Sequence, residues 1–148
     1  HFIRSHCLFH KSVLSSLRMV AEEQSAKNKI VFLGTPSVAA ESLRILIESS
    51  ATGNFDIRAV VTQPPSRVGR GKKIAKSPVH ELAEENQIPV FTPETARDPL
   101  FLNNISDLNP DLCISAAYGQ FLPQKFLEIP RLGTLNVHPS LLPRFRGA

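Results

Sequence analysis

The sequence is poor in cysteine and has no long apolar segment. Its two cysteines, Cys7 and Cys113, stand in unlike contexts and give neither a metal-ligand spacing nor a disulfide framework. No apolar run approaches the ~20 residues that a membrane-spanning helix needs. The sequence therefore predicts no bound metal and no membrane partner, and this cysteine usage fits a reducing compartment. Cys113 lies in an apolar run and is predicted to be a small core residue.

The glycine-rich fingerprint of dinucleotide-binding domains is also absent. Gly34-Thr35-Pro36 joins an apolar run to a helical pattern, but the chain has no G-x-G-x-x-G there. This argues against half of a nicotinamide-dependent dehydrogenase, an alternative that predicts binding of NAD. We expect Thr35 to cap the helix that follows and Pro36 to occupy its first position.

The first twenty residues lack acidic side chains. They contain several serines and the cations Arg4, Lys11 and Arg18. Such a composition is typical of an organelle transit peptide, so residues 1–28 are predicted to be a leader and linker with a mitochondrial or plastid address. The alternative is that Met19 is the true start, because the chain begins with His1. In that case the protein would be cytoplasmic.

The rest of the chain alternates between strand and helix patterns. At 148 residues, 42% hydrophobic and 20% charged, it is expected to form one domain with a real core. Short apolar runs typical of buried parallel strands alternate with stretches of helical spacing. The fold class predicted is α/β, with an open, mostly parallel Rossmann-like sheet and helices on both faces. The expected strands are 29–34, 55–63, 90–92, 111–117 and 134–138. The expected helices are 38–50, 77–88 and 100–108, and 124–129 is expected to be a short helix or a turn.

A polar pair follows the last apolar run. Asn136 and His138 are two residues apart, so in an extended strand their side chains share one face while Leu135 and Val137 face the other. Pro139 has no backbone N–H and ends regular pairing there. Open α/β sheets bind ligands at the carboxyl ends of their strands, so this pair is predicted to border a ligand crevice.

A strongly basic segment follows the second expected strand. Residues 66–76 carry five cations and no acid, whereas the net charge of the whole chain is only +4. Two glycines in the segment disfavour a helix and predict a mobile loop. Clustered cations of this kind suit phosphate backbones, although a solvated loop is the simpler alternative. His80, just beyond the segment, is expected at the surface of a helix that Ser77 caps.

Four strings carry a resemblance to a known family. N-x-H-P-S-L-L-P-x-x-x-G at 136–147 resembles the signature of the folate-dependent formyltransferases, and K-I-V-F-L-G-T-P resembles their opening strand. A-Y-G-x-x-L-P at 117–123 resembles their folate loop. T-Q-P followed by G-R-G-K-K and S-P-V resembles the branch that acts on transfer RNA, although Pro65-Ser66-Arg67 departs from its pattern.

The resemblance implies roles for particular residues. It implies that Asn136 and His138 are catalytic. It implies folate contacts by Tyr118, Gly119, Phe121, Leu122, Ser140, Leu141, Leu142 and Pro143, and transfer RNA contacts by Arg67, Arg70, Lys72 and Lys73. The similarity spans residues 29–148, so this range is expected to be an N-terminal formyltransferase domain. It is expected to be incomplete at its C-terminus, before the family's catalytic Asp and its C-terminal barrel.

The function implied is transfer of a formyl group from 10-formyltetrahydrofolate to the amino group of initiator methionyl-tRNA, in organellar translation initiation. Asn136 would donate its amide N–H to the tetrahedral oxyanion, and His138 would take the proton of the attacking amine. The fragment is expected to be inactive by itself, and the resemblance suggests a monomer. Two alternatives stay open: a transferase or hydrolase that uses the same folate on a small molecule, and a non-catalytic truncated product.

Overall fold

The centre of the fold is a parallel five-stranded sheet. The computed structural model describes residues 27–68 and 73–138. The strands are β1 (Asn28–Gly34), β2 (Phe55–Val61), β5 (Val90–Phe91), β6 (Leu112–Ala116) and β7 (Thr134–Val137), in the order β5-β2-β1-β6-β7. Every neighbouring pair is parallel. The predicted sheet is confirmed, with strand limits within two residues of those expected.

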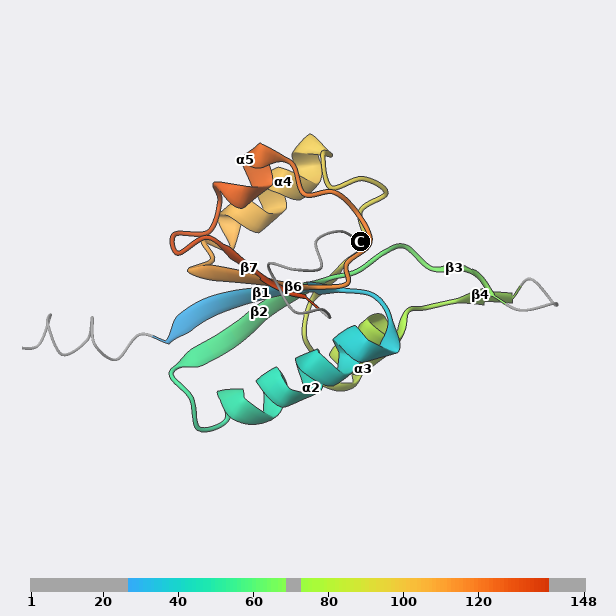
Figure 1. Ribbon diagram of the computed structural model, residues 1–148, viewed down its shortest axis with the longest axis horizontal. Helices are drawn as coiled ribbons and strands as arrows, with labels where there is room; N and C mark the ends of the chain where they lie inside the picture. The colour runs from blue at the N-terminus through green and yellow to red at the C-terminus, as the bar shows by residue number, and fades with distance from the viewer. Residues whose placement is uncertain (1–26, 69–72, 139–148) are drawn as a thin grey trace, which may run out of the picture.

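Helices cover both faces of this sheet, as predicted. Helices α2 (Ser37–Ser50) and α3 (Pro78–Glu85) lie on one face, and α4 (Pro99–Asp107) and α5 (Gln124–Leu127) lie on the other (Figure 1). The chain adds strands in one direction from β1 to β2 and β5, and then reverses to add β6 and β7 on the opposite side of β1. Right-handed crossovers in opposite directions place the two helix pairs on opposite faces.

The core has one apolar cluster on each side of the sheet. Alternate residues of β1 divide between them, because side chains alternate across a strand. Val31 and Leu33 pack on the side that includes Phe101 and Phe126, whereas Phe32 packs with Leu43. Cys113 is fully buried, which confirms that it is a core residue.

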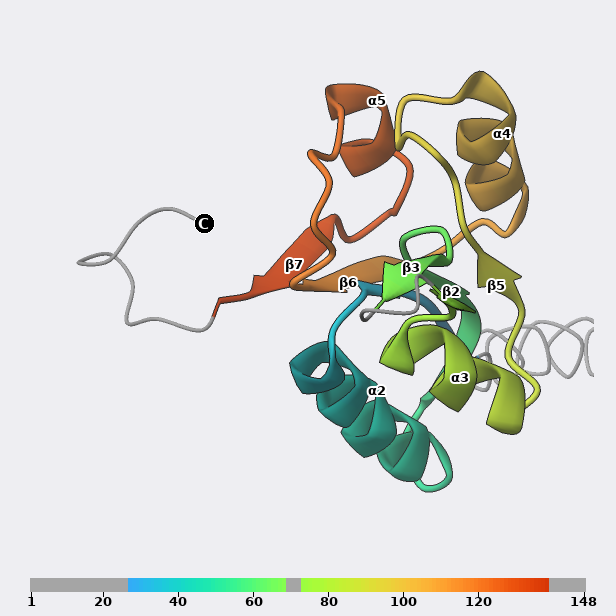
Figure 2. The same cartoon turned by 90° about the vertical axis from the view of Figure 1, so that its right-hand side faces the viewer.

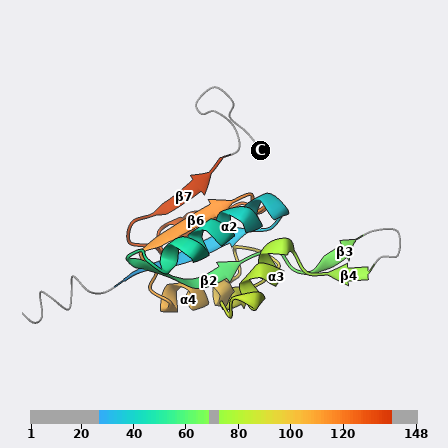
Figure 3. The ribbon, with the colours of Figure 1, turned by 90° about the horizontal axis from the view of Figure 1, so that it is seen from below.

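The basic segment was predicted to be a loop, and the structure corrects this prediction. Strands β3 (Ser66–Val68) and β4 (Lys73–Ala75) form an antiparallel pair, with Arg67 opposite Ile74. We call this pair the arm, and it projects from the carboxyl edge of the sheet (Figures 1 and 3). Three-residue strands are too short to show a periodic pattern, and their ladder depends on a partner strand that periodicity alone does not reveal.

Two expected helix caps have different outcomes. Ser77 caps α3 as predicted, because its hydroxyl accepts a hydrogen bond from His80 N at 3.1 Å. The expected cap of α2 by Thr35 is wrong. Helix α2 begins at Ser37 after Pro36 as N-cap, and the Thr35 hydroxyl donates to the Tyr118 carbonyl oxygen at 2.8 Å instead. The Thr35 hydroxyl therefore bonds to a residue 83 positions away in the chain and not to the first turn of α2.

Asp111 links two segments by hydrogen bonds at the amino edge of the sheet. Its carboxylate accepts from Lys29 N at 2.8 Å and from Arg131 Nε at 3.0 Å, and so joins β1 to the turn before β7. These partners lower the pKa of the Asp111 carboxyl below its ordinary value, the Lys29 amide first and the Arg131 guanidinium second. A carboxyl with a lowered folded-state pKa stabilises the fold above its unfolded pKa, and this contribution is lost as the pH falls toward the folded value.

We therefore expect Asp111→Asn to lower the stability of the full-length protein near neutral pH. The deficit should shrink as the pH falls below about 4, the ordinary range of an aspartate. Urea unfolding midpoints measured from pH 6 to pH 2 test this, with the exposed Asp107 replaced by asparagine as the matched control. A deficit that is the same at every pH would contradict the assignment.

Candidate functional site

The carboxyl edge of the sheet contains a topological switch point. The chain leaves β1 toward β2 on one side, and β6 lies on the other side of β1. The loops after β1 and β6 therefore depart in opposite directions, which is where open α/β sheets form their ligand crevices. Thr35 follows β1 and Ala117 follows β6, so the two loops meet at this point.

The loop after β6 makes a sharp turn, which we call the 117–119 turn. Ala117 has φ of 46° and Gly119 has φ of 88°, so two of its three residues are left-handed. Alanine in this conformation costs about 1 kcal/mol, and glycine avoids the cost because it has no Cβ. A Cβ at Gly119 would also overlap the side-chain amide of Gln63.

Side chains from two other strand ends hold this turn. The Tyr118 carbonyl oxygen accepts from Thr35 Oγ1 at 2.8 Å and from Gln63 Nε2 at 3.2 Å. The ends of β1, β2 and β6 are thereby joined at the switch point. Sequence reasoning missed Thr35 and Gln63 in this role, although their place within two residues of strand ends was a usable signal.

The Tyr118 side chain lies inside the molecule. It is 2% exposed within the core cluster that faces α4 and α5, and burial raises the pKa of its phenol to about 12. Its hydroxyl has no hydrogen-bond partner among the described residues. Burial likewise raises the pKa of the Cys113 thiol to about 12, which favours its protonated form. The predicted folate contact of Tyr118 stays a prediction. The backbone of Tyr118 lies at the strand ends, whereas its side chain is in the core.

The residues after the turn differ in exposure. Phe121 is 77% exposed, whereas Leu122 packs partly against the core. Between the turn and these residues, the Gln120 side chain accepts from Ala96 N at 2.9 Å and so holds the loop between β5 and α4. The predicted folate contacts of Gly119, Phe121 and Leu122 therefore fall on one loop whose two ends are fixed. An exposed phenylalanine ring can stack on a flat aromatic ligand.

Strand β7 carries the predicted catalytic pair to the same edge. Asn136 is exposed and pairs in register with Ser115 of β6, and His138 follows the end of the strand half-buried. Leu135 and Val137 alternate with Asn136 and are 58% and 49% exposed. Figure 2 shows β7 at the side of the sheet opposite β5. Ser140, Leu141, Leu142 and Pro143 lie outside the described residues.

A hollow of about 220 Å³ lies between the ends of β1 and β2 and the root of the arm. Thr35 and Gln63 line it on one side, and Ser66, Lys76 and Ser77 line it on the other. The hollow therefore joins the strand ends to the basic segment. Arg67 is exposed on β3, while Arg70, Lys72 and the side chain of Lys73 are outside the described part.

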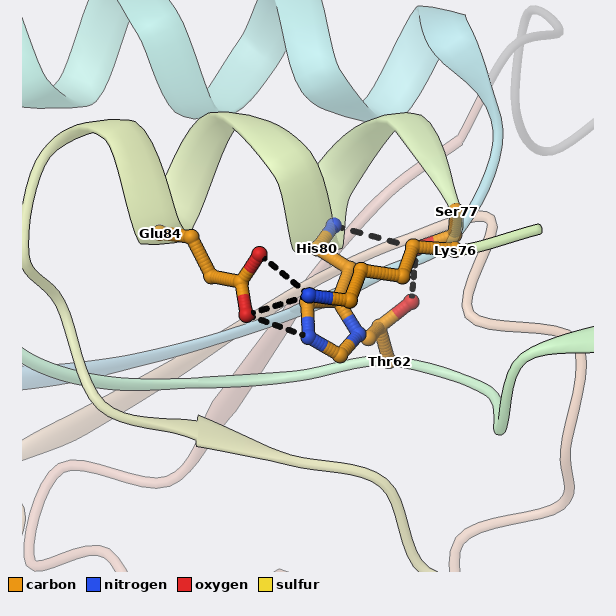
Figure 4. A network of polar contacts seen from close by, with 5 residues as sticks. All are labelled: Thr62, Lys76, Ser77, His80 and Glu84. Atoms are coloured by element: carbon orange, nitrogen blue, oxygen red, sulfur yellow. Dashed lines mark hydrogen bonds and ion pairs between the residues drawn. The ribbon is translucent and has the colours of Figure 1, made fainter.

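A polar network holds the root of the arm against α3 (Figure 4). Lys76 Nζ contacts both carboxylate oxygens of Glu84 at 2.7 Å, and the buried Thr62 hydroxyl lies 2.7 Å from Ser77 Oγ. The hydrogen bond from Lys76 is the main cause that lowers the pKa of the Glu84 carboxyl. Among the described residues, Lys76 is thus paired with Glu84 at the root of the arm.

His80 belongs to this network, and its predicted surface position is wrong. Its side chain is 12% exposed, and Nε2 lies 3.3 Å from Glu84 Oε1. The first turn of α3 packs against the strands, so His80 is covered even though a helical position beside Glu81 looks polar. The i,i+4 spacing of His80 and Glu84 was the signal for their contact.

Comparison with known proteins decides the family. The profile described as Formyl transferase matches residues 28–148, which is most of the chain. The chain belongs to the formyl transferase family. Among the described residues, no group of three or more His, Cys, Asp or Glu side chains could hold a metal ion. None of the helices in this part of the chain has both the length and the apolar character that a transmembrane span requires.

Relatives within the formyl transferase family are close over the matched region. The chain is 53% identical over 120 residues to a methionyl-tRNA formyltransferase of Clostridioides difficile, covering 81% of this chain and 38% of that protein. It is 52% identical over 120 residues to a protein of the same name from Frankia alni, covering 81% and 35%. The chain thus spans little more than a third of the length of these relatives.

Solved structures of other formyl transferases share the fold. Phosphoribosylglycinamide formyltransferase from Bacillus halodurans matches with a TM-score of 0.62 at 18% identity, over 81% of this chain and 60% of that one. Glycinamide ribonucleotide transformylase 1 from Symbiobacterium toebii matches with a TM-score of 0.65 at 20% identity, over 82% and 56%. These matches confirm the predicted α/β fold.

Proposed function

We propose that this formyl transferase moves the formyl group of 10-formyltetrahydrofolate to the amino group of initiator methionyl-tRNA. The observation that carries the proposal is the exposure of Asn136 near the carboxyl end of β7. His138 is the first residue after this strand. The relatives named methionyl-tRNA formyltransferase support the choice of substrate.

The proposed chemistry needs an oxyanion donor and a proton acceptor. The amine attacks the formyl carbon, and the carbonyl oxygen becomes an oxyanion in a tetrahedral intermediate. Asn136 stabilises this charge with its amide N–H, and the His138 imidazole takes the proton that the amine loses. Collapse of the intermediate breaks the bond from carbon to the folate nitrogen, which regains a proton. The 117–119 turn and the exposed Phe121 border the place proposed for the pterin.

The reaction can be tested directly with the full-length protein. We expect formylation of charged initiator methionyl-tRNA, with 10-formyltetrahydrofolate as donor and uncharged tRNA as the control without an amine. Formylation of glycinamide ribonucleotide or of a sugar nucleotide, with methionyl-tRNA left untouched, would overturn the proposal and favour the small-molecule alternative. Release of formate without any acceptor would favour a hydrolase.

The arm gives a separate prediction about the tRNA. Replacing Arg70, Lys72 and Lys73 together by alanine should raise the KM for methionyl-tRNA and reduce the slope of log binding constant against log salt by up to about three, since each lost phosphate contact removes about one. Arg67→Ala alone should reduce it by about one. Binding measured between 50 and 200 mM salt tests this, and Lys125→Ala, an exposed cation of α5, is the matched control. An unchanged slope in every variant would contradict a role of the arm.

We further propose that residues 1–28 direct the protein to a mitochondrion or plastid, and that residues 29–148 form a partial catalytic domain with little activity alone. The acid-free first twenty residues support the address. The low activity rests on the resemblance, which assigns the partner carboxylate of His138 to a later part of such enzymes. A fluorescent fusion of residues 1–28 tests the address. A comparison of residues 1–148 with the full-length protein tests the activity.

A further inference from the structure

The 117–119 turn is held in a conformation that its own sequence disfavours. Ala117 is left-handed without being glycine, and Gly119, two residues further on, is left-handed as well. Left-handed residues persist where surrounding contacts over-determine them, and such positions are enriched at ligand sites. The contacts responsible must come from outside the turn.

Those contacts converge on one atom. The Tyr118 carbonyl oxygen accepts one hydrogen bond from Thr35 Oγ1 and one from Gln63 Nε2. On the other side, the Tyr118 ring is anchored in the core at 2% exposure. Tyr118 is therefore fixed at its backbone by β1 and β2 and at its side chain by the core.

Gln63 has a second contact with the turn. Its side-chain amide occupies the space where a Cβ of residue 119 would stand, so the amide packs directly over Gly119. Gln63 therefore acts on Tyr118 through a hydrogen bond and on Gly119 through packing. Two residues beyond Gly119, the same loop carries Phe121, whose side chain is exposed.

We propose that Thr35 and Gln63 are positioning residues for the folate: they hold the 117–119 turn in place at the switch point, so that the loop through Phe121 is preformed to receive the pterin. The inference rests on the proposed function. Neither residue needs to touch the reacting atoms. Their loss should therefore weaken folate binding while the formyl-transfer step itself is retained.

Isosteric variants of the full-length protein test the two hydrogen-bond donors while the packing of their side chains is kept. Gln63→Met and Thr35→Val each keep the side-chain size and remove one donor. Each should raise the KM for 10-formyltetrahydrofolate about three- to tenfold, the usual effect of one lost hydrogen bond, with kcat at saturating folate and the KM for methionyl-tRNA within about twofold. Gln63→Glu places a carboxylate against the carbonyl oxygen and should raise the KM about tenfold or more.

Two further variants distinguish positioning from a general loss of structure. Thr35→Ser keeps the hydroxyl and should restore the wild-type KM. Gln124→Met makes the same chemical change as Gln63→Met at an exposed position on α5. The Gln124 side chain donates to Glu128 Oε1, which follows the same helix, so this variant should leave the KM unchanged. Amide hydrogen exchange at Gly119 should accelerate in Gln63→Met and Thr35→Val but not in Gln124→Met.

The outcomes separate the inference from the proposed function. If the wild-type protein neither binds 10-formyltetrahydrofolate nor formylates methionyl-tRNA, the proposed function fails. If the wild-type protein does both, and Gln63→Met and Thr35→Val leave the KM for folate within twofold, the positioning role is overturned. A fall in kcat that equals the rise in KM for folate would also overturn it, because that pattern indicates a general loss of the site.

Discussion

Replacing Asn136 by alanine in the full-length protein should lower kcat for methionyl-tRNA formylation by about 10²- to 10³-fold. This is the usual cost of removing one oxyanion donor, about 3 to 4 kcal/mol of transition-state stabilisation. The amide gains strength only as negative charge develops, so the KM values should change much less than kcat. Steady-state kinetics with both substrates varied measures the two effects separately.

Because Asn136 is exposed, its replacement by alanine should change the reaction without changing the stability of the fold. Its side chain is exposed on β7, so alanine creates no cavity and the unfolding midpoint should stay within the range of ordinary surface substitutions. Asn136→Asp keeps the shape and replaces the donor by an anion, so it should be at least as damaging as alanine. Asn103→Ala, on the exposed surface of α4, is the matched control. An Asn136→Ala protein with more than a third of wild-type kcat would contradict the proposed role.

Replacing Phe126 by alanine should destabilise the fold by about 3 to 5 kcal/mol, the usual cost of removing a buried phenylalanine. Phe126 is fully buried, and its ring stacks on that of Phe101 with centroids 6.0 Å apart and planes 7° apart. Helix α5 has only four residues, too few for its own hydrogen bonds to hold it. Phe126 is therefore the main anchor of the segment that leads into β7.

Urea unfolding of the full-length protein measures this loss, and hydrogen exchange along β6 and β7 locates it. Exchange should accelerate most in β7, since that strand has a described neighbour on one side only, β6. Leu127→Ala is the matched control, because Leu127 is next in sequence and 39% exposed. Equal losses of stability in the two variants would show that burial of Phe126 does not anchor α5.

Much of the fold was predictable because it follows from local patterns. Short apolar runs such as 29–34 mark strands that are buried on both faces, and Ser77-Pro78 marks the start of a helix through its cap and the fixed φ of proline. Asn136 was placed on a strand by the apolar run that contains it, and the structure has it on β7; that it shares a face with His138 stays a prediction.

Other features depend on contacts between distant segments. Thr35 looked like a helix cap, yet its hydroxyl bonds to Tyr118 from 83 residues away. His80 looked like a surface residue, yet the packing of α3 covers it. The arm looked like a loop, yet its two short strands pair with each other. In each case the deciding contact lies outside the local sequence pattern.

The amino-acid sequence by itself determined which segments become the strands of the central sheet and the helices that cover it, and which side chains stand near the ends of those strands. Periodicity and capping depend only on residues that are close together in the sequence. Only the tertiary structure decided that the ends of β1, β2 and β6 meet on one carbonyl oxygen, and that a left-handed Ala117 is maintained there. The physical reason is that a hydrogen-bond partner is chosen by distance in space, which the order of strands in the sheet sets.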